Sequence, residues 1–312
     1  MTTLERLEGW RKSGTIREEQ YQAISALVRK QRFSVYLELN VLLYLGVLFF
    51  VGGAGWTVQK YFSNLGDFAV IASLTIMVSG CFYYCITRTK PWSKEQVDSP
   101  NLGFDYVLYL ACLLFAVELG YVETRFNLLD NQWDYYLLLS TLLFFACAYR
   151  FDNRFVLSLA LTTLATWFGI RTSRLEFFQL SAIRGSAISF AIVAIVAGVL
   201  LHRAGVKKHF LETYLHIATN VLLAALTTGV LDKVWWYLPI ALTACAVAFL
   251  CGLQFRRFAF VAYGIIYGYI VISARILQWK MSDTQVLTYF IVSGIVVLLG
   301  MILLARRIGR AA

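Results

Sequence analysis

The chain has 312 residues, of which 59% are hydrophobic and only 15% are charged, and its net charge is +10. A soluble domain contains about a quarter charged residues, so this composition excludes an ordinary soluble protein and indicates an integral membrane protein. Membrane topology and attraction to an anionic inner leaflet explain the positive charge, and no nucleic-acid partner is required.

Residues 1–34 are predicted to form a cytosolic amphipathic helical hairpin. Leu4, Leu7 and Trp10 recur at three-residue steps, and Gly14 is expected to take the left-handed conformation that ends the first helix. About 30 residues cannot bury enough apolar surface to fold securely alone. The hairpin is therefore expected to dock, either on its own membrane domain or lipid, or on a protein partner.

Three short motifs near the N-terminus carry a resemblance to known proteins. The pattern L-x-x-L-x-x-W-x-x-x-G-x-I runs from Leu4 to Ile16, EEQ follows at Glu18–Gln20, and the glycine-rich LGVLFFVGGAGW occupies Leu45–Trp56. On these motifs, residues 4–56 resemble a family of uncharacterised bacterial polytopic membrane proteins. The resemblance implies a short cytosolic helical cap followed by many membrane spans, and it implies no activity.

The remaining residues, 35–312, are predicted to form an all-α domain of about ten transmembrane helices. Each apolar run is continuous over about 20 residues, which is the length of a helical span and does not match the alternation of a membrane barrel. A polar segment precedes the first run, which is long enough to stay in the membrane, so no cleavable signal peptide is expected. The runs are 36–58, 66–87, 103–122, 132–149, 153–170, 181–202, 209–230, 234–253, 257–276 and 283–305.

Two sequence signals place both termini in the cytoplasm. With ten spans and a cytoplasmic N-terminus, 20 of the 28 Lys and Arg residues lie on the cytoplasmic side, where loops retain positive charge. Six of the eight Trp residues lie at the opposite ends of the spans, where interfacial rings are enriched. The sequence therefore predicts a multi-pass protein of the bacterial inner membrane.

Motifs of soluble-type enzymes are absent from the sequence. It contains no P-loop, no dinucleotide-binding glycine pattern, no G-x-S-x-G elbow and no H-E-x-x-H zinc motif. The six cysteines form no C-x-x-C pair and are interpreted as small core residues. No cofactor is expected, and the sequence leaves a metal open.

Ionisable residues inside spans mark the first candidate site, because they cost free energy there and face a bundle interior or a wet cavity. In the segment HFLETYLHIATN, four polar residues lie three or four positions apart and share one helix face. Interhelical packing, proton or ion handling and metal binding all remain open for this stripe, with carboxylates of the first and third spans as further partners. The candidate polar or ion pathway comprises Glu38, Asp105, His209, Glu212, His216 and Asn220.

A second set of charged residues lies about one turn from the outer ends of three spans. It consists of Glu118, Arg184 and Arg275. A structural ion pair between the glutamate and either arginine is the favoured interpretation. The alternative is that one arginine holds an anionic substrate.

Three functions are compatible with this sequence. Span number and buried charge favour a small-molecule or ion transporter, since ten spans divide into two fives of opposite orientation, as in secondary transporters with inverted repeats. A membrane scaffold or sensor acting through the N-terminal hairpin is the alternative, and a membrane-embedded enzyme is the least favoured class. A polar cavity reaching the middle of the bundle would favour transport, and an apolar groove on the hairpin would favour the scaffold.

Overall fold

The computed structural model describes residues 3–28, 36–61, 66–128, 133–175, 180–278 and 282–311. These residues form α-helices and one short 3₁₀ helix, and none of them forms a β-strand. The all-α prediction is therefore confirmed. The chain divides into two compact units, Met1–Asn64 and Leu65–Ala312, which are described separately.

The first unit contains three helices, α1 (Thr3–Lys12), α2 (Glu18–Val28) and α3 (Tyr36–Tyr61). Helices α1 and α2 pack together as a hairpin. Its interior holds Leu7 and Tyr21, and the Arg11 guanidinium lies 4.7 Å from the centre of the Tyr21 ring. Gly14 has a φ of +72°, in the left-handed region that a glycine adopts without steric cost. Gly14 lies in the turn between the two helices, and the cytosolic hairpin domain of residues 1–34 stays a prediction.

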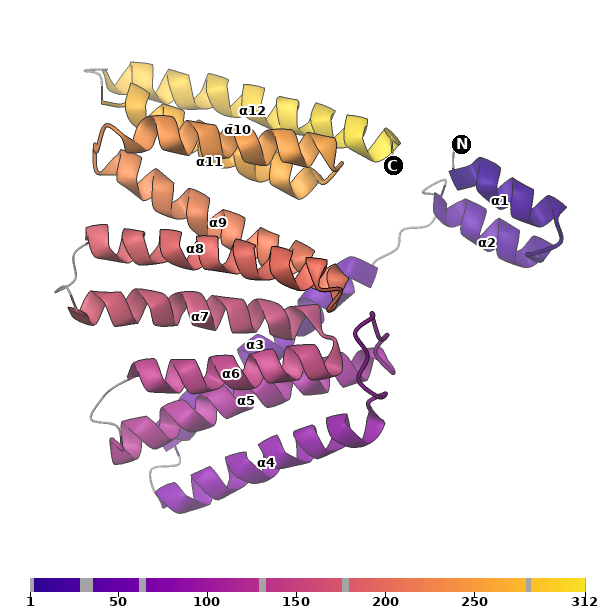
Figure 1. Ribbon diagram of the computed structural model, residues 1–312, viewed down its shortest axis with the longest axis vertical. Coiled ribbons are helices and arrows are strands. Elements are labelled where there is room, and N and C mark those ends of the chain that lie inside the picture. The colour runs from indigo at the N-terminus through magenta and orange to yellow at the C-terminus, as the bar shows by residue number, and fades with distance from the viewer. Residues whose placement is uncertain are drawn as a thin grey trace. The chain divides into compact units, whose positions relative to one another are not determined.

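The second unit is a row of antiparallel helices in chain order (Figure 1). Four close helical hairpins can be distinguished in it, α4–α5, α6–α7, α8–α9 and α10–α11, followed by α12. The elements are α4 (Asp67–Arg88), α5 (Leu102–Phe126), α6 (Trp133–Phe151), α7 (Arg154–Leu175), α8 (Leu180–Arg203), η1 (Lys208–Phe210), α9 (Leu211–Leu231), α10 (Tyr237–Gln254), α11 (Phe258–Ile276) and α12 (Asp283–Ala311).

In all four hairpins, the turn that joins the two helices lies on the same side of the row, on the right in Figure 1. We call this the strap end, because residues 89–101, which link α4 to α5 without helix and are called the strap, lie there. The opposite end, where each hairpin is open, is called the open end. The short turns at Asp152, Lys207 and Arg257 therefore all lie at the strap end.

Among the described residues, seven helices are long and apolar enough to cross a membrane. They are Asp67–Arg88, Gly103–Phe126, Ser181–Arg203, Lys208–Leu231, Tyr237–Gln254, Phe258–Ile276 and Asp283–Ala305. Helices α6 and α7 have the length of a span but are not among these seven, and α3 contributes the shorter apolar stretch Leu42–Gly53. Several helices of this chain are therefore able to span a membrane, and the count of ten stays a prediction.

Apolar packing fills the space between the hairpins. The largest cluster joins α4 through α9, where Phe104, Phe144 and Phe190 are fully buried. Smaller clusters around Leu223 and Leu226 join α9 to α10 and α11. Helix α12 differs from the rest, since none of its apolar window is buried within the chain. In a membrane protein, lipid covers such a surface.

The α10–α11 hairpin is packed unusually closely. A Cβ atom on Gly264 would lie 2.6 Å from the Cys245 carbonyl oxygen and 2.9 Å from the Phe249 backbone nitrogen. A Cβ atom on Gly252 would lie 2.6 Å from the Val261 nitrogen. Glycine is needed at both positions because the two backbones touch there.

Candidate functional site

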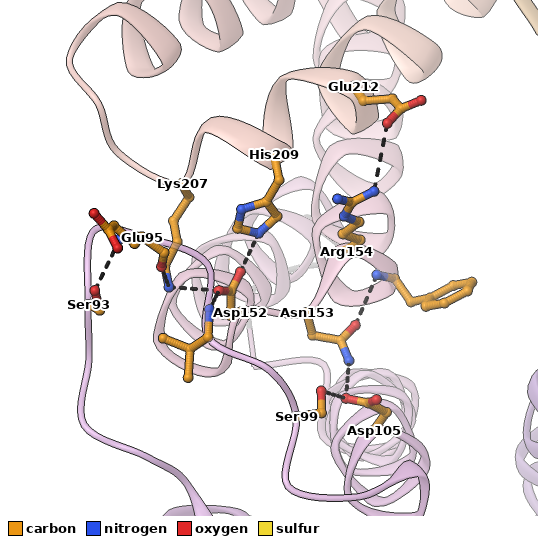
Figure 2. Close-up of polar contacts among 12 residues, drawn as sticks. Ser93, Glu95, Ser99, Asp105, Asp152, Asn153, Arg154, Lys207, His209 and Glu212 are labelled. Atoms are coloured by element: carbon orange, nitrogen blue, oxygen red, sulfur yellow. Dashed lines mark hydrogen bonds and ion pairs between the residues drawn. The ribbon is translucent and has the colours of Figure 1, made fainter. Parts of the chain in front are cut away.

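Most charged side chains that contact one another at the strap end come from the turns of different hairpins (Figure 2). At the centre lies Asp152, which follows α6 and adopts a φ of +58°. Its side chain is 2% exposed and pairs with Lys207, whose side chain is 1% exposed. Burial of two opposite charges is tolerated only when both are well paired and hydrogen-bonded.

The Asp152 carboxylate is fully occupied by donors. Its Oδ2 atom accepts hydrogen bonds from Lys207 Nζ at 2.9 Å and from the Val97 backbone nitrogen at 2.5 Å. The Oδ1 atom faces the Nε2 atom of His209. Three segments that are distant in sequence therefore meet at one carboxylate.

A second carboxylate, Asp105, lies close by at the start of α5. Its Oδ1 atom accepts hydrogen bonds from the Ser99 hydroxyl at 2.7 Å and the Asn153 side-chain nitrogen at 2.8 Å. Asn153 also caps α7, because its Oδ1 atom accepts from the backbone nitrogens of Phe155 and Val156. Asp105 is thereby tied to the α6–α7 turn.

Glu212, in the first turn of α9, lies between two arginines. Its Oε1 atom is 2.7 Å from Arg257 Nη1, and its Oε2 atom is 3.7 Å from Arg154 Nη1. His216 lies one turn further along α9, and its Nε2 atom is 3.8 Å from Glu212 Oε1. Glu212 and His216 are both half-buried, so this cluster remains in partial contact with the surroundings.

The polar stripe continues along α9 against α11. His216 Nδ1 is 3.1 Å from the Tyr263 hydroxyl, and the His216 ring stacks on Phe260 with the ring centres 4.6 Å apart. Another turn along, the Tyr267 hydroxyl donates to Asn220 Oδ1 at 3.5 Å. We call the set Glu212, His216, Asn220, Tyr263 and Tyr267 the α9–α11 band.

The structure keeps only three of the six residues of the predicted pathway together. Glu212, His216 and Asn220 lie together in the α9–α11 band, whereas His209 turns toward Asp152. Asp105 contacts Ser99 and Asn153. Glu38 belongs to α3 in the other unit, and its side chain lies outside the described residues.

A metal centre would need several ligands converging on one point. Within the described part of the chain, no group of three or more His, Cys, Asp or Glu residues is arranged to hold a metal ion. The cysteines in this part are free thiols.

The three charged residues of the predicted outer set have different partners. Glu118 accepts a hydrogen bond from the Thr75 hydroxyl. Arg184 pairs with Asp232 and lies over the Tyr237 ring, whose centre is 5.0 Å away. Arg275 donates to Gln278. The structure thus brings Glu118 to α4, Arg184 to the end of α9 and Arg275 to its own helix end.

Several paired residues were not among the sequence-based candidates, notably Asp152 and Lys207. Both lie between apolar runs, in short turns where a charge is usually solvated. The only signal in the sequence was that both residues lie in very short connections. A charged side chain in such a connection has to stay close to the ends of the adjoining helices. Their pairing depends on which turns are neighbours.

Fold and site together define a multi-span α-helical membrane protein in which charged turns join neighbouring hairpins. Residues 8–157 match the family model described as "Predicted membrane protein (DUF2157)". The match confirms the resemblance, which was stated for residues 4–56, and continues it to the start of α7. No curated protein and no solved structure matches the chain.

Proposed function

We propose that the chain is a membrane transporter in which the α9–α11 band moves protons. The observation that carries this proposal is the band itself, a row of half-buried ionisable, amide and hydroxyl groups along two apolar helices. Ionisable groups at membrane depth are costly and mark ion or proton pathways more often than other features of a span.

The chemistry of the band suits proton transfer. An imidazole exchanges protons near neutral pH, and His216 contacts Glu212 through one ring nitrogen and the Tyr263 hydroxyl through the other. Arg257 and Arg154 hold Glu212 at the strap end, where a proton would enter or leave. Asn220 and Tyr267 extend the row of donors and acceptors by one more turn.

Ten spans with both termini in the cytoplasm form part of this proposal, together with a bacterial inner-membrane location. Helices α6 and α7 contain 19 and 22 residues, and at 1.5 Å per residue they are about 28 and 33 Å long, close to the thickness of the hydrocarbon core. They also lie in the same antiparallel row as the seven apolar helices (Figure 1). Positive strap-end connections then face the anionic inner leaflet.

Reporter fusions test this topology. Fusions after Lys94, Arg154, Lys208 and Arg257 are expected to report the cytoplasm, and fusions after Arg125 and Lys233 the outside. A pattern that inverts beyond residue 170 would show that α7 does not cross the membrane, and the ten-span proposal would then be wrong.

Proton flux into liposomes tests the function. The purified full chain is reconstituted with a trapped pH-sensitive dye, and a potassium gradient with valinomycin drives protons inward. We expect flux well above that of protein-free liposomes and its loss in Glu212→Gln, with the amount of folded protein unchanged. Glu118→Gln is the matched control, since it removes another carboxylate in a span but lies outside the band. Wild-type flux equal to that of protein-free liposomes, or full flux in Glu212→Gln, would contradict the proposal.

A second candidate, a scaffold or sensor acting through the N-terminal hairpin, is supported by the surface of α1. Trp10 is 52% exposed although Leu7 on the same helix is buried. An exposed aromatic ring on a short hairpin is suited to contact with a protein partner or with lipid. Deletion of residues 1–30 distinguishes the two candidates, because a proton pathway in the second unit would keep its flux without the hairpin.

A further inference from the structure

The strap is a non-helical segment whose backbone is held by the turns of two other hairpins. Most of its residues are exposed. Yet Lys94 and Glu95 each offer a carbonyl oxygen to Lys207, the first to the backbone nitrogen at 2.8 Å and the second to Nζ at 2.9 Å. The Val97 backbone nitrogen donates to Asp152.

The two residues that hold the strap are the same two that pair with each other. Lys207 belongs to the α8–α9 turn and Asp152 to the α6–α7 turn, and their buried ion pair joins the two turns. Figure 2 shows the strap passing beside this pair, with Glu95 next to Lys207. Asp152 and Lys207 therefore contribute both to the attachment of the strap and to the buried tie between the two turns.

Weaker contacts hold the strap on either side of this point. Ser99 donates to Asp105, and Arg150 donates to the Lys90 carbonyl oxygen at 3.2 Å. Neither contact involves a fully buried charge, and neither joins the α6–α7 turn to the α8–α9 turn. The buried part of the tie between these turns is centred on Asp152, which pairs with Lys207 and faces His209, whereas the Arg154–Glu212 pair beside it is only half-buried.

We propose that the strap is a latch, closed by the Asp152–Lys207 pair, which holds the strap-end turns of the α6–α7 and α8–α9 hairpins together. When the pair separates, the strap leaves the surface and the two turns are free to move apart. The latch is independent of the proton-transport proposal, because Asp152 and Lys207 lie outside the α9–α11 band.

Trypsin cleavage after Lys94 measures whether the latch is closed, since the carbonyls on both sides of that bond are held by Lys207. The purified full chain in detergent is used. The test variant is Asp152→Gly combined with Lys207→Met, which leaves neither charge buried without its partner, and glycine suits the positive φ at residue 152. We expect cleavage at Lys94 at least tenfold faster than in wild type, with an unchanged elution volume and helical content.

Arg154→Gln is the matched control for this measurement. It changes a charge next to the same turn, but the ion-pair partner of Arg154 is Glu212 on α9 and not a residue of the strap. Its Lys94 cleavage is expected at the wild-type rate. If the double variant is folded and is cleaved at Lys94 no faster than wild type, the latch proposal is wrong.

Amide hydrogen exchange tests the second part of the proposal, the tie between the turns. The Asn153 amide donates to Ala148 and the Val206 amide to Leu201, one in each turn. In the folded double variant, both are expected to exchange at least tenfold faster, together with Val97. Faster exchange at Val97 alone would show a passive loop without a latch, and the proposal would then be wrong.

Discussion

The open end and the strap end of the second unit use ion pairs in opposite ways. At the open end, each of three hairpins has an acid and an arginine that join its own two helices. These pairs are Asp67–Arg125, Asp134–Arg171 and Arg184–Asp232. At the strap end, the pairs join different hairpins, as in Asp152–Lys207 and Arg154–Glu212–Arg257.

Chain connectivity explains the difference. At the strap end, a turn already holds the two helices of a hairpin together, so charged groups are available to join one hairpin to the next. At the open end the helices of a hairpin are not directly connected, and an ion pair replaces the missing connection. Asp67 and Asp134 also lie in the first turns of α4 and α6, where a negative charge interacts favourably with the helix dipole.

The α10–α11 hairpin departs from this pattern. Its open-end arginine, Arg275, bonds to Gln278 on the same helix end. Close backbone contact at Gly252 and Gly264 joins the two helices instead. A hairpin of this protein is therefore closed either by an ion pair at its open end or by small residues along its length.

The largest effect is expected for Lys207→Met at the strap end. This change leaves the Asp152 carboxylate buried with its main cationic partner removed, which costs about 3–5 kcal/mol for buried pairs. Unfolding of the purified chain in mixed micelles measures the loss. The Asp152→Gly/Lys207→Met double variant is expected to recover part of it. A loss under about 1 kcal/mol for Lys207→Met, as for an exposed pair, would mean that water reaches the pair, and the contrast between the ends would weaken.

Gly264→Ala is expected to have the next largest effect, about 1–3 kcal/mol, because the new methyl group meets backbone atoms that have no room to move. The same unfolding measurement applies. Gly268→Ala is the matched control, since its Cβ would make an ordinary contact with Cys245 at 3.8 Å. Equal stability of the two variants would contradict closure of this hairpin by glycine contact.

Asp232→Asn tests the Arg184–Asp232 ion pair at the open end. It leaves Arg184, whose side chain is 4% exposed, without its carboxylate, but Asp232 itself is 40% exposed, so water replaces part of the interaction. We expect a loss of about 1–2 kcal/mol, between the values for exposed and buried pairs. A loss as large as that of Lys207→Met would remove the distinction between the two ends.

Glu212→Gln is expected to have the smallest effect on stability, about 0.5 kcal/mol or less, since the amide still hydrogen-bonds and the site is partly exposed. Glu212→Leu removes that capacity and is expected to cost about 0.5–2 kcal/mol. A large loss for the glutamine variant would show that the band serves packing alone, and its effect on proton flux would then have no separate meaning.

Helix type, approximate helix positions and the shared face of Glu212, His216 and Asn220 could be predicted because they depend on local periodicity. Helical spacing alone places residues four apart on one face. Their partners could not be predicted, since Tyr263 and Tyr267 lie on a helix that follows 47 residues later. The sequence also suggested that Glu118 forms an ion pair with Arg184 or Arg275. In the structure, Arg184 pairs with Asp232.

By itself, the sequence determined that the protein is helical and membrane-embedded, that a hairpin with a glycine turn precedes the spans, and that polar groups share one face of α9. Composition and periodicity are local properties, and they specify elements one at a time. Tertiary structure alone decided that Asp152, Lys207 and the strap meet, and that His209 leaves the stripe to join them. Such contacts depend on which turns become neighbours when the hairpins pack, and local sequence patterns do not predict which turns these are.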